Sequence, residues 1–307
     1  MPHASSFPHI AIPDNVDLWT VVFDHQRRQQ QKFSATKELM TCGSTGRCYS
    51  WADLRSASVE FGKGLKAIWG WKKADVLALY TPNSIDTPIV TLGALWAGGI
   101  VSPANPLYTS DELAFQLRDS GAKALVTQKP FLQTAIAAAK KAGLPENRII
   151  LLGDQRDGKF RHFCSIRSTS YTGHYAKTSI QPKRDLAFLV YSSGTTGLPK
   201  GVCLTHHNMV SNLLQYDYVE GSQWLAHGGY DGDGDKQLGI LPFFHIYVSG
   251  PSMTATGSPR RALLTIDRAS HAASWRLYSP AGNLSSWSGL TWRRSCRPFR
   301  IIVSPLL

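Results

Sequence analysis

Cysteine is scarce and irregularly placed in this chain. The five cysteines are odd in number and scattered over 307 residues, at positions Cys42, Cys48, Cys164, Cys203 and Cys296. Cys42 and Cys48 have neither the spacing of a metal site nor histidine partners. The pattern therefore argues against a structural zinc site, and it predicts reduced thiols in an intracellular protein.

Long hydrophobic runs are also missing. The longest apolar stretch, residues 89–104, is interrupted by three glycines and a proline, so it is too short for a membrane span. Residues 1–20 have no basic start leading into an apolar core, which predicts that there is no secretory signal. We expect no transmembrane segment.

Acidic residues are rare and lysine is absent toward the end of the chain. The net charge is +12, but residues 251–307 hold eight arginines, one aspartate and no lysine, so this segment carries +7 and the first 250 residues about +5. Aromatic residues do not alternate with basic ones in any stretch that would stack on bases. We therefore expect no nucleic-acid partner.

Between residues 10 and 205, strand-like and helix-like segments alternate, which predicts an α/β fold with a largely parallel sheet flanked by helices. Capping patterns at Ser50 and Thr109 predict two helix starts. The expected strands are residues 76–80, 100–104, 122–127, 148–152 and 186–191. The expected helices are residues 50–68, 82–96, 109–121, 131–141 and 205–215. Residues 153–184 lack periodicity and are interpreted as a basic surface connection.

One glycine- and hydroxyl-rich stretch, YSSGTTGLPKGV at residues 191–202, is the most informative in the chain. Glycines let the backbone approach a ligand closely, and hydroxyls and a lysine can hold phosphate oxygens. The candidate phosphate ligands are Ser192, Ser193, Gly194, Thr195, Thr196, Gly197 and Lys200. We expect this loop to connect a strand to a helix. Its spacing differs from a Walker P-loop, and the alternative is a flexible linker.

The same stretch resembles the phosphate-binding signature of the adenylate-forming superfamily, which includes acyl-CoA synthetases, 4-coumarate–CoA ligases and luciferases. The resemblance covers residues 10–247 and includes the segments 81–83, 97–100 and 104–109. It implies the N-terminal subdomains of the adenylate-forming fold, in an incomplete form. It also implies that residues 192–197 contact the β- and γ-phosphates of ATP and that Lys200 is catalytic.

The resemblance implies an acid–CoA ligase that uses ATP, Mg²⁺ and CoA and takes a small carboxylic acid as substrate. Such chemistry needs positioning and neutralisation of phosphate charge, and it needs no protein nucleophile. The alternative from a different class is a catalytically inactive remnant that retains nucleotide or partner binding. The resemblance leaves the oligomeric state open.

A second segment, LPFFHIY at residues 241–247, resembles the part of the family that lines the acyl pocket. By resemblance, His245 and Tyr247 contact the acid, which favours an aromatic or medium-chain substrate. The alternative is a core strand whose histidine has its hydrogen bonds satisfied within the protein. His206 and His207 lie at a helix start, which favours capping or structural roles. Residues 231–235 fail the calcium-loop pattern, so no metal ligands are assigned.

The resemblance ends near residue 250. The last glutamate is Glu220 and the last lysine is Lys236, so the family's later magnesium-binding glutamate and C-terminal lysine have no counterpart. We interpret residues 1–250 as the N-terminal part of an AMP-binding (adenylation) domain. Residues 251–307 are interpreted as a divergent, non-native or disordered tail that comes from a shifted frame, a retained intron or a faulty gene model. The expected location is the cytoplasm or peroxisome, although residues 305–307 are not a peroxisomal address.

Overall fold

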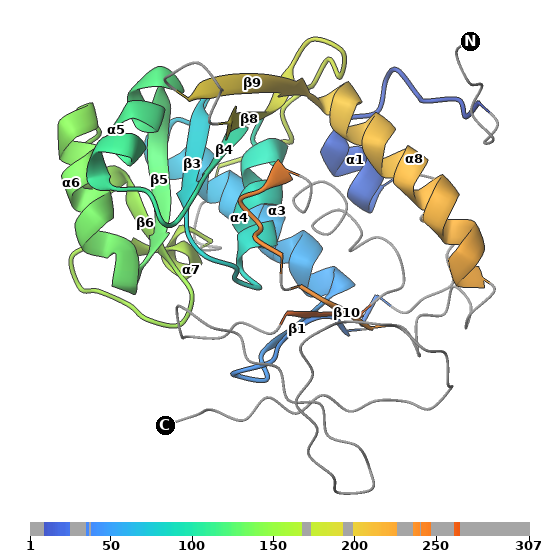
Figure 1. Cartoon of the computed structure of the whole chain (residues 1–307), viewed down its shortest axis with the longest axis horizontal. Coiled ribbons are helices and arrows are strands. Elements are labelled where there is room, and N and C mark those ends of the chain that lie inside the picture. Colours follow the sequence, from blue (N-terminus) through green and yellow to red (C-terminus); the bar gives the residue numbers. More distant parts are fainter. Residues whose placement is uncertain are drawn as a thin grey trace, which may run out of the picture.

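The larger of two sheets has seven strands in the order β7-β6-β5-β3-β4-β8-β9 (Figure 1). The computed structural model describes residues 9–24, 35–36, 38–167, 173–192, 199–225, 236–239, 241–246 and 261–264. The strands are β3 (Val76–Tyr80), β4 (Ile100–Ala104), β5 (Ala122–Gln128), β6 (Ile149–Leu152), β7 (Arg161–His162), β8 (Leu186–Ser192) and β9 (Lys200–Thr205). Neighbouring strands are parallel except β8 and β9. The predicted α/β fold with a largely parallel sheet is confirmed.

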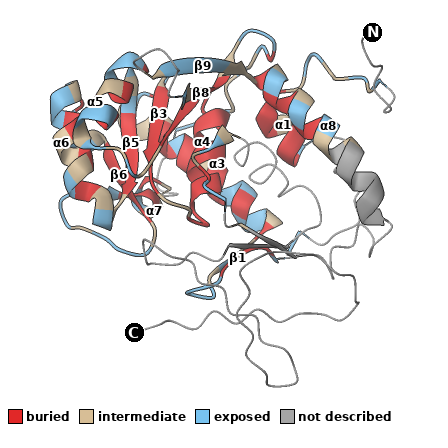
Figure 2. Ribbon diagram, in the orientation of Figure 1, coloured by how far each residue is buried: buried red, intermediate tan, exposed pale blue. Residues whose placement is uncertain are grey.

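Helices cover both faces of this sheet (Figure 1). Alternate residues of β3 point to opposite faces: Leu77 and Leu79 pack with α3 and α4, whereas Ala78 and Tyr80 pack with α5 and α6. The α-helices are α1 (Leu18–Phe23), α3 (Trp51–Trp69), α4 (Thr87–Trp96), α5 (Ser110–Asp119), α6 (Leu132–Ala142), α7 (Phe163–Ile166) and α8 (His206–Leu225). Two 3-10 turns are η1 (Lys129–Phe131) and η2 (Glu146–Arg148). The buried residues concentrate in the central strands and the helix faces toward them (Figure 2).

Local sequence signals set the starts of two helices. Ser50 and Thr109 both form capping boxes, in which their side chains accept the backbone N–H of Asp53 and Glu112. In α3, the spaced apolar residues Leu54, Ala57, Phe61 and Leu65 are buried, as the pattern predicts. Both capping predictions are confirmed.

Two glycines allow α3 and α4 to approach closely. A Cβ at Gly62 would lie 2.6 Å from the Trp96 ring, and one at Gly93 would lie 2.7 Å from the Ser58 carbonyl oxygen. Any larger residue would push the helices apart. The packing of α3 on α4 therefore depends on the absence of side chains at the contact.

Two expected elements differ from the structure. The helix expected from residue 82 begins at Thr87, because residues 81–86 form a loop with its own hydrogen bonds. The connection 153–184 is not entirely a surface loop: it contains β7 and α7, and Phe163 and Ile166 are buried. These elements have only two and four residues, too few to show a period in the sequence.

A smaller sheet has the strand order β10-β11-β1-β2. Its strands are β1 (Glu38–Cys42), β2 (Cys48–Ser50), β10 (Lys236–Leu238) and β11 (Arg261–Leu264). β11 pairs in parallel with β1, although its residues belong to the segment that we interpret from the sequence as a tail. The rest of residues 251–307 lies outside the described part, so that interpretation stays a prediction.

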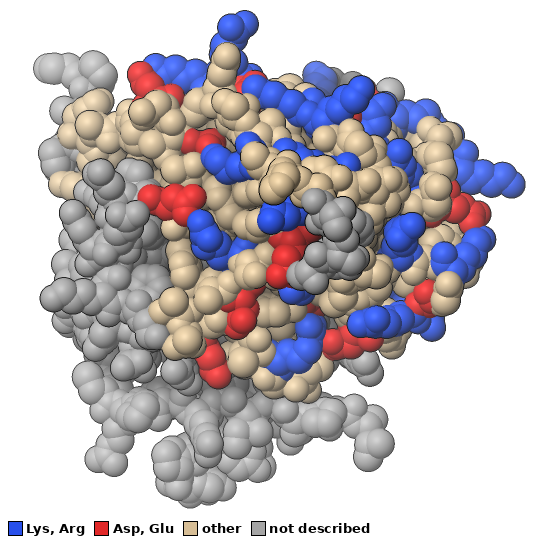
Figure 3. All heavy atoms as spheres, turned by 180° about the vertical axis from the view of Figure 1, so that it is seen from behind, with Lys and Arg blue, Asp and Glu red and all other residues tan. Residues whose placement is uncertain are grey.

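The surface and the composition of the described part add three observations. Lys and Arg side chains are interspersed with Asp and Glu over the face in Figure 3. Among the described helices, none has the length and apolar character to cross a bilayer. Cys42, Cys48, Cys164 and Cys203 are free thiols, and Cys296 lies outside the described residues.

Candidate functional site

Ser192 and Lys200 face each other across the β8–β9 hairpin. They form its last register pair, next to the connecting loop, and both are exposed. The other predicted phosphate ligands, Ser193, Gly194, Thr195, Thr196 and Gly197, lie outside the described residues. The hairpin therefore places one hydroxyl and one cation side by side at the base of the glycine-rich loop.

The loop connects two strands, so the prediction that it connects a strand to a helix is wrong. β9 intervenes before α8, which begins at His206. Six residues of β8 have a register partner in the antiparallel strand β9. This pairing depends on both strands, so neither segment shows it alone. The helix-cap signal at Thr205 instead led to the prediction of a helix directly after the loop.

Tyr191 fixes the hairpin to the neighbouring helix α5. Its hydroxyl donates to the Asp119 carboxylate. Burial and this carboxylate together raise the pKa of Tyr191, so the phenol stays protonated as a donor. Gly201 lies opposite Tyr191, and a Cβ there would come within 3.1 Å of the Tyr191 ring. The glycine leaves room for the ring across the hairpin.

His245 lies in a turn, and its side chain is exposed. Its backbone N–H donates to the carbonyl of Pro242 at 3.1 Å. Phe243, two residues earlier, is buried and packs with Leu39, Met40, Cys42 and Ile85. The core strand of the alternative interpretation is not found, because residues 241–246 form no strand and the buried residue among them is Phe243. Tyr247 lies outside the described residues.

Asn83 connects this turn to the loop between β3 and α4. Its side-chain amide donates to the carbonyls of Gly239 at 3.0 Å and Leu241 at 2.8 Å, and its oxygen accepts the N–H of Phe243 at 2.7 Å. In the sequence, the only signal for Asn83 is its place in the segment 81–83, which resembles a family pattern.

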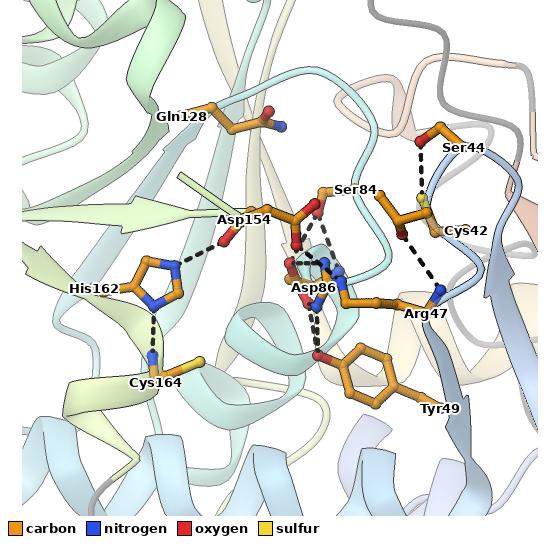
Figure 4. A network of polar contacts seen from close by, with 12 residues as sticks. Cys42, Ser44, Arg47, Tyr49, Ser84, Asp86, Gln128, Asp154, His162 and Cys164 are labelled. Carbon is orange, nitrogen blue, oxygen red and sulfur yellow. Dashed lines mark hydrogen bonds and ion pairs between the residues drawn. The ribbon is translucent and has the colours of Figure 1, made fainter. Parts of the chain in front are cut away.

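Asp86 is the centre of a buried polar network at the other end of the same loop (Figure 4). The Arg47 guanidinium donates two hydrogen bonds to it, at 3.1 and 2.8 Å, and the Tyr49 hydroxyl donates a third at 2.6 Å. Arg47 also forms an ion pair with Asp154 at 2.9 Å. Hydrogen bonding to Asp86 raises the pKa of Arg47, and burial followed by the Asp86 charge raises that of Tyr49. No sequence motif predicts this network.

His206 has a structural position at the start of α8. Its Nδ1 atom accepts the backbone N–H of Leu18 at 3.2 Å, and the ring is buried. Burial lowers the pKa of His206 to about 4, against the opposing effect of Asp17 and Asp185. The neutral ring holds the N-terminal segment against α8. The helix cap itself is Thr205, whose hydroxyl accepts the N–H of Asn208.

The chain matches the family model described as "AMP-binding enzyme" over residues 23–259. It is 33% identical over 246 residues to 4-coumarate-CoA ligase 1 of Narcissus pseudonarcissus, covering 79% of this chain and 42% of that protein. It is 35% identical over 228 residues to a long-chain-fatty-acid–CoA ligase of Escherichia coli O157:H7, covering 66% of this chain and 39% of that protein. The chain thus spans less than half the length of these curated relatives.

Solved structures agree at the level of the fold. A long-chain-fatty-acid-CoA ligase from Archaeoglobus fulgidus superposes with a TM-score of 0.69 at 23% identity, over 85% of this chain and 49% of that one. An anthranilate CoA ligase in complex with anthranoyl-AMP gives a TM-score of 0.64 at 20% identity, over 82% of this chain and 45% of that one. With its family match over most of its length and an α/β sheet shared with adenylate-forming enzymes, the chain belongs to the AMP-binding enzyme family.

Proposed function

We propose that the chain carries the nucleotide-binding part of an acid–CoA ligase, which activates a carboxylic acid with ATP and transfers the acyl group to CoA. The observation that carries this proposal is the register pair of Ser192 and Lys200 at the base of the glycine- and hydroxyl-rich loop. Membership of the AMP-binding family and the ligase relatives support it.

In the proposed reaction, a carboxylate oxygen of the acid attacks the α-phosphorus of ATP. A new P–O bond forms, the bond to pyrophosphate breaks, and an acyl adenylate results. The CoA thiol then attacks the acyl carbon, loses its proton, and displaces AMP. For the first step the protein must position phosphates and neutralise their charge. The Lys200 ammonium and the Ser192 hydroxyl are suited to hold the β- and γ-phosphates.

Magnesium and CoA are part of this proposal, but no described residue is assigned to them. Among the residues that the structure describes, no cluster of three or more His, Cys, Asp or Glu side chains could hold a metal ion. We therefore derive no step from a protein-bound Mg²⁺. In phosphate-transfer sites much of the magnesium coordination comes from the nucleotide and water.

For the acid, we propose an aromatic or medium-chain substrate whose carboxylate end lies near His245. The exposed imidazole of His245, held on a turn beside the buried Phe243, supports this placement. The relatives are named for 4-coumarate and for long-chain fatty acids, which makes these two acids the first to test. Tyr247 is proposed to contact the same acid.

The test measures ATP binding and acid-dependent ATP–pyrophosphate exchange in the full chain. Lys200→Met should weaken ATP binding or exchange roughly tenfold to a hundredfold, because it removes a charged contact to phosphate. Lys123→Met, which changes another exposed strand lysine, on β5, is the matched control and should behave as wild type. The free energy of unfolding should stay the same in both variants.

Two outcomes separate the competing functions. ATP binding without exchange for any acid of the panel would favour an inactive remnant that retains the nucleotide site. Neither binding nor exchange would contradict both the ligase and the nucleotide site. Equal effects of the two lysine substitutions would contradict the role of Lys200.

We also propose that residues 1–250 belong to the AMP-binding domain and that residues 251–307 are divergent because of a faulty gene model. The loss of lysine and glutamate after residue 236 supports this. Translating the neighbouring reading frames of the transcript tests it. If no frame restores sequence similar to the relatives, the proposal is wrong.

A further inference from the structure

The side chain of Asn83 links two segments that are about 160 residues apart. Two of its hydrogen bonds are donated by the amide nitrogen, to Gly239 and Leu241, and the third is accepted from the Phe243 N–H. A primary amide is suited to this task because it is both donor and acceptor. Gly239, Leu241 and Phe243 are alternate residues, so one side chain contacts the backbone at three successive odd-numbered positions.

The loop that carries Asn83 is itself firmly anchored. On the β3 side, Gln128 at the end of β5 donates to the Thr81 hydroxyl at 2.8 Å and to the Pro82 carbonyl at 3.3 Å. On the α4 side, Arg47 and Tyr49 hold the buried Asp86 (Figure 4). Because both ends are tied to sheet elements, Asn83 projects from a rigid support.

The held segment ends at Phe243, two residues before His245. The buried ring of Phe243 fixes the segment against β1 and Ile85, and the Pro242 carbonyl closes the turn onto the His245 N–H. His245 itself is exposed. The contacts therefore hold the backbone at Gly239, Leu241 and Phe243, a few residues before this exposed position.

We propose that Asn83 is a positioning residue for the acid subsite. By clamping residues 239–243, it sets where His245 meets the carboxylate of the bound acid. This inference rests on the proposed function for the part that concerns the acid. The clamp itself is a property of the unliganded chain.

Asn83→Asp is the sharpest variant because it keeps the shape of the side chain. The aspartate oxygen can still accept from Phe243, but the carboxylate cannot donate to Gly239 and Leu241 and faces two carbonyl oxygens instead. Protonation of the carboxyl at low pH restores one donor. A role of the donated hydrogen bonds thus predicts a partial recovery as the pH falls. Asn147→Asp makes the same change at an exposed position and is the control.

The experiment compares the full-length wild type, Asn83→Asp and Asn147→Asp. The first measurement is amide hydrogen exchange of residues 239–246 without ligand. The second is equilibrium binding of 4-coumarate and a long-chain fatty acid, with ATP binding measured separately. In Asn83→Asp, exchange should be roughly tenfold faster or more, and the Kd for the acid should rise roughly tenfold, as two lost hydrogen bonds imply. ATP binding should change less than about twofold, and Asn147→Asp should match wild type.

Unchanged hydrogen exchange in Asn83→Asp would overturn the clamp, whatever the binding data show. Faster exchange with an unchanged acid Kd would overturn the positioning role. If the wild type binds neither acid, the proposed function fails for these substrates and the acid part of the inference fails with it. The exchange measurement still decides whether Asn83 holds the segment, so the two failures are distinguishable.

Discussion

The centre of the large sheet and its β8–β9 edge differ in how far their residues are exposed. Every residue of β3 and β4 is buried, whereas the first four residues of β9 are exposed. The polar side chains of Asn83 and Asp86, which follow β3, form hydrogen bonds within the protein. At the hairpin, Ser192 and Lys200 remain exposed. The difference indicates that the centre provides stability, whereas the edge keeps its polar side chains in contact with solvent.

The largest effect should come from breaking the buried network at the centre. Arg47→Met removes the guanidinium that neutralises Asp86, whose carboxylate is fully buried. Leaving a buried charge without its partner should cost about 3–5 kcal/mol in the free energy of unfolding, measured by urea denaturation. Lys141→Met breaks an exposed ion pair with Asp111 and should cost about 1 kcal/mol or less. Equal losses of unfolding free energy in the two variants would contradict the difference between the buried and the exposed ion pair.

A smaller effect should come from pH, through His206, which is buried at the start of α8. The folded pKa of His206 is lowered to about 4 from an ordinary value of 6.5. The unfolded chain therefore takes up the proton first, so stability that is fully present above pH 6.5 is lost as the pH falls toward 4. The loss should be about 3 kcal/mol.

His206→Asn tests this because it keeps an acceptor for the Leu18 N–H and cannot titrate in this range. Its stability should vary less than that of wild type between pH 4 and 6.5, measured by urea denaturation at each pH. His174→Asn, at an exposed histidine, should follow the wild-type profile. The lowered pKa values of Asp17 and Asp185 add their own losses at lower pH, so the comparison stops at pH 4. Parallel stability profiles for wild type and His206→Asn would contradict the assignment of this pH dependence to His206.

The smallest effects should come from one substitution made in both regions. Val101 in β4 is 0% exposed and Val202 in β9 is 48% exposed. Val101→Ala should destabilise the protein by about 2–3 kcal/mol, because it removes buried methyl groups and leaves a cavity. Val202→Ala should change the free energy of unfolding by about 0.5 kcal/mol or less. Chemical denaturation of the two variants measures this, and a similar cost at both sites would show that the hairpin belongs to the packed core.

Local patterns were sufficient for much of the fold. The capping residues Ser50 and Thr109 and the short apolar runs of β3, β4 and β5 predicted these elements because their signals lie within a few residues. The strand β9 was missed, because what makes it a strand is its pairing with β8. The buried helix α7 was missed because a single turn has no period.

For the candidate site, the sequence identified the residue types and their order. It determined that hydroxyls, glycines and a lysine occur together within residues 192–200. Only the tertiary structure decided that Asn83 holds the segment before His245 and that Arg47 neutralises Asp86. These contacts join residues that are 39 to 160 positions apart in the sequence. Only the packing of the whole chain brings such residues together, because the burial that stabilises each contact exists only once the sheet has formed.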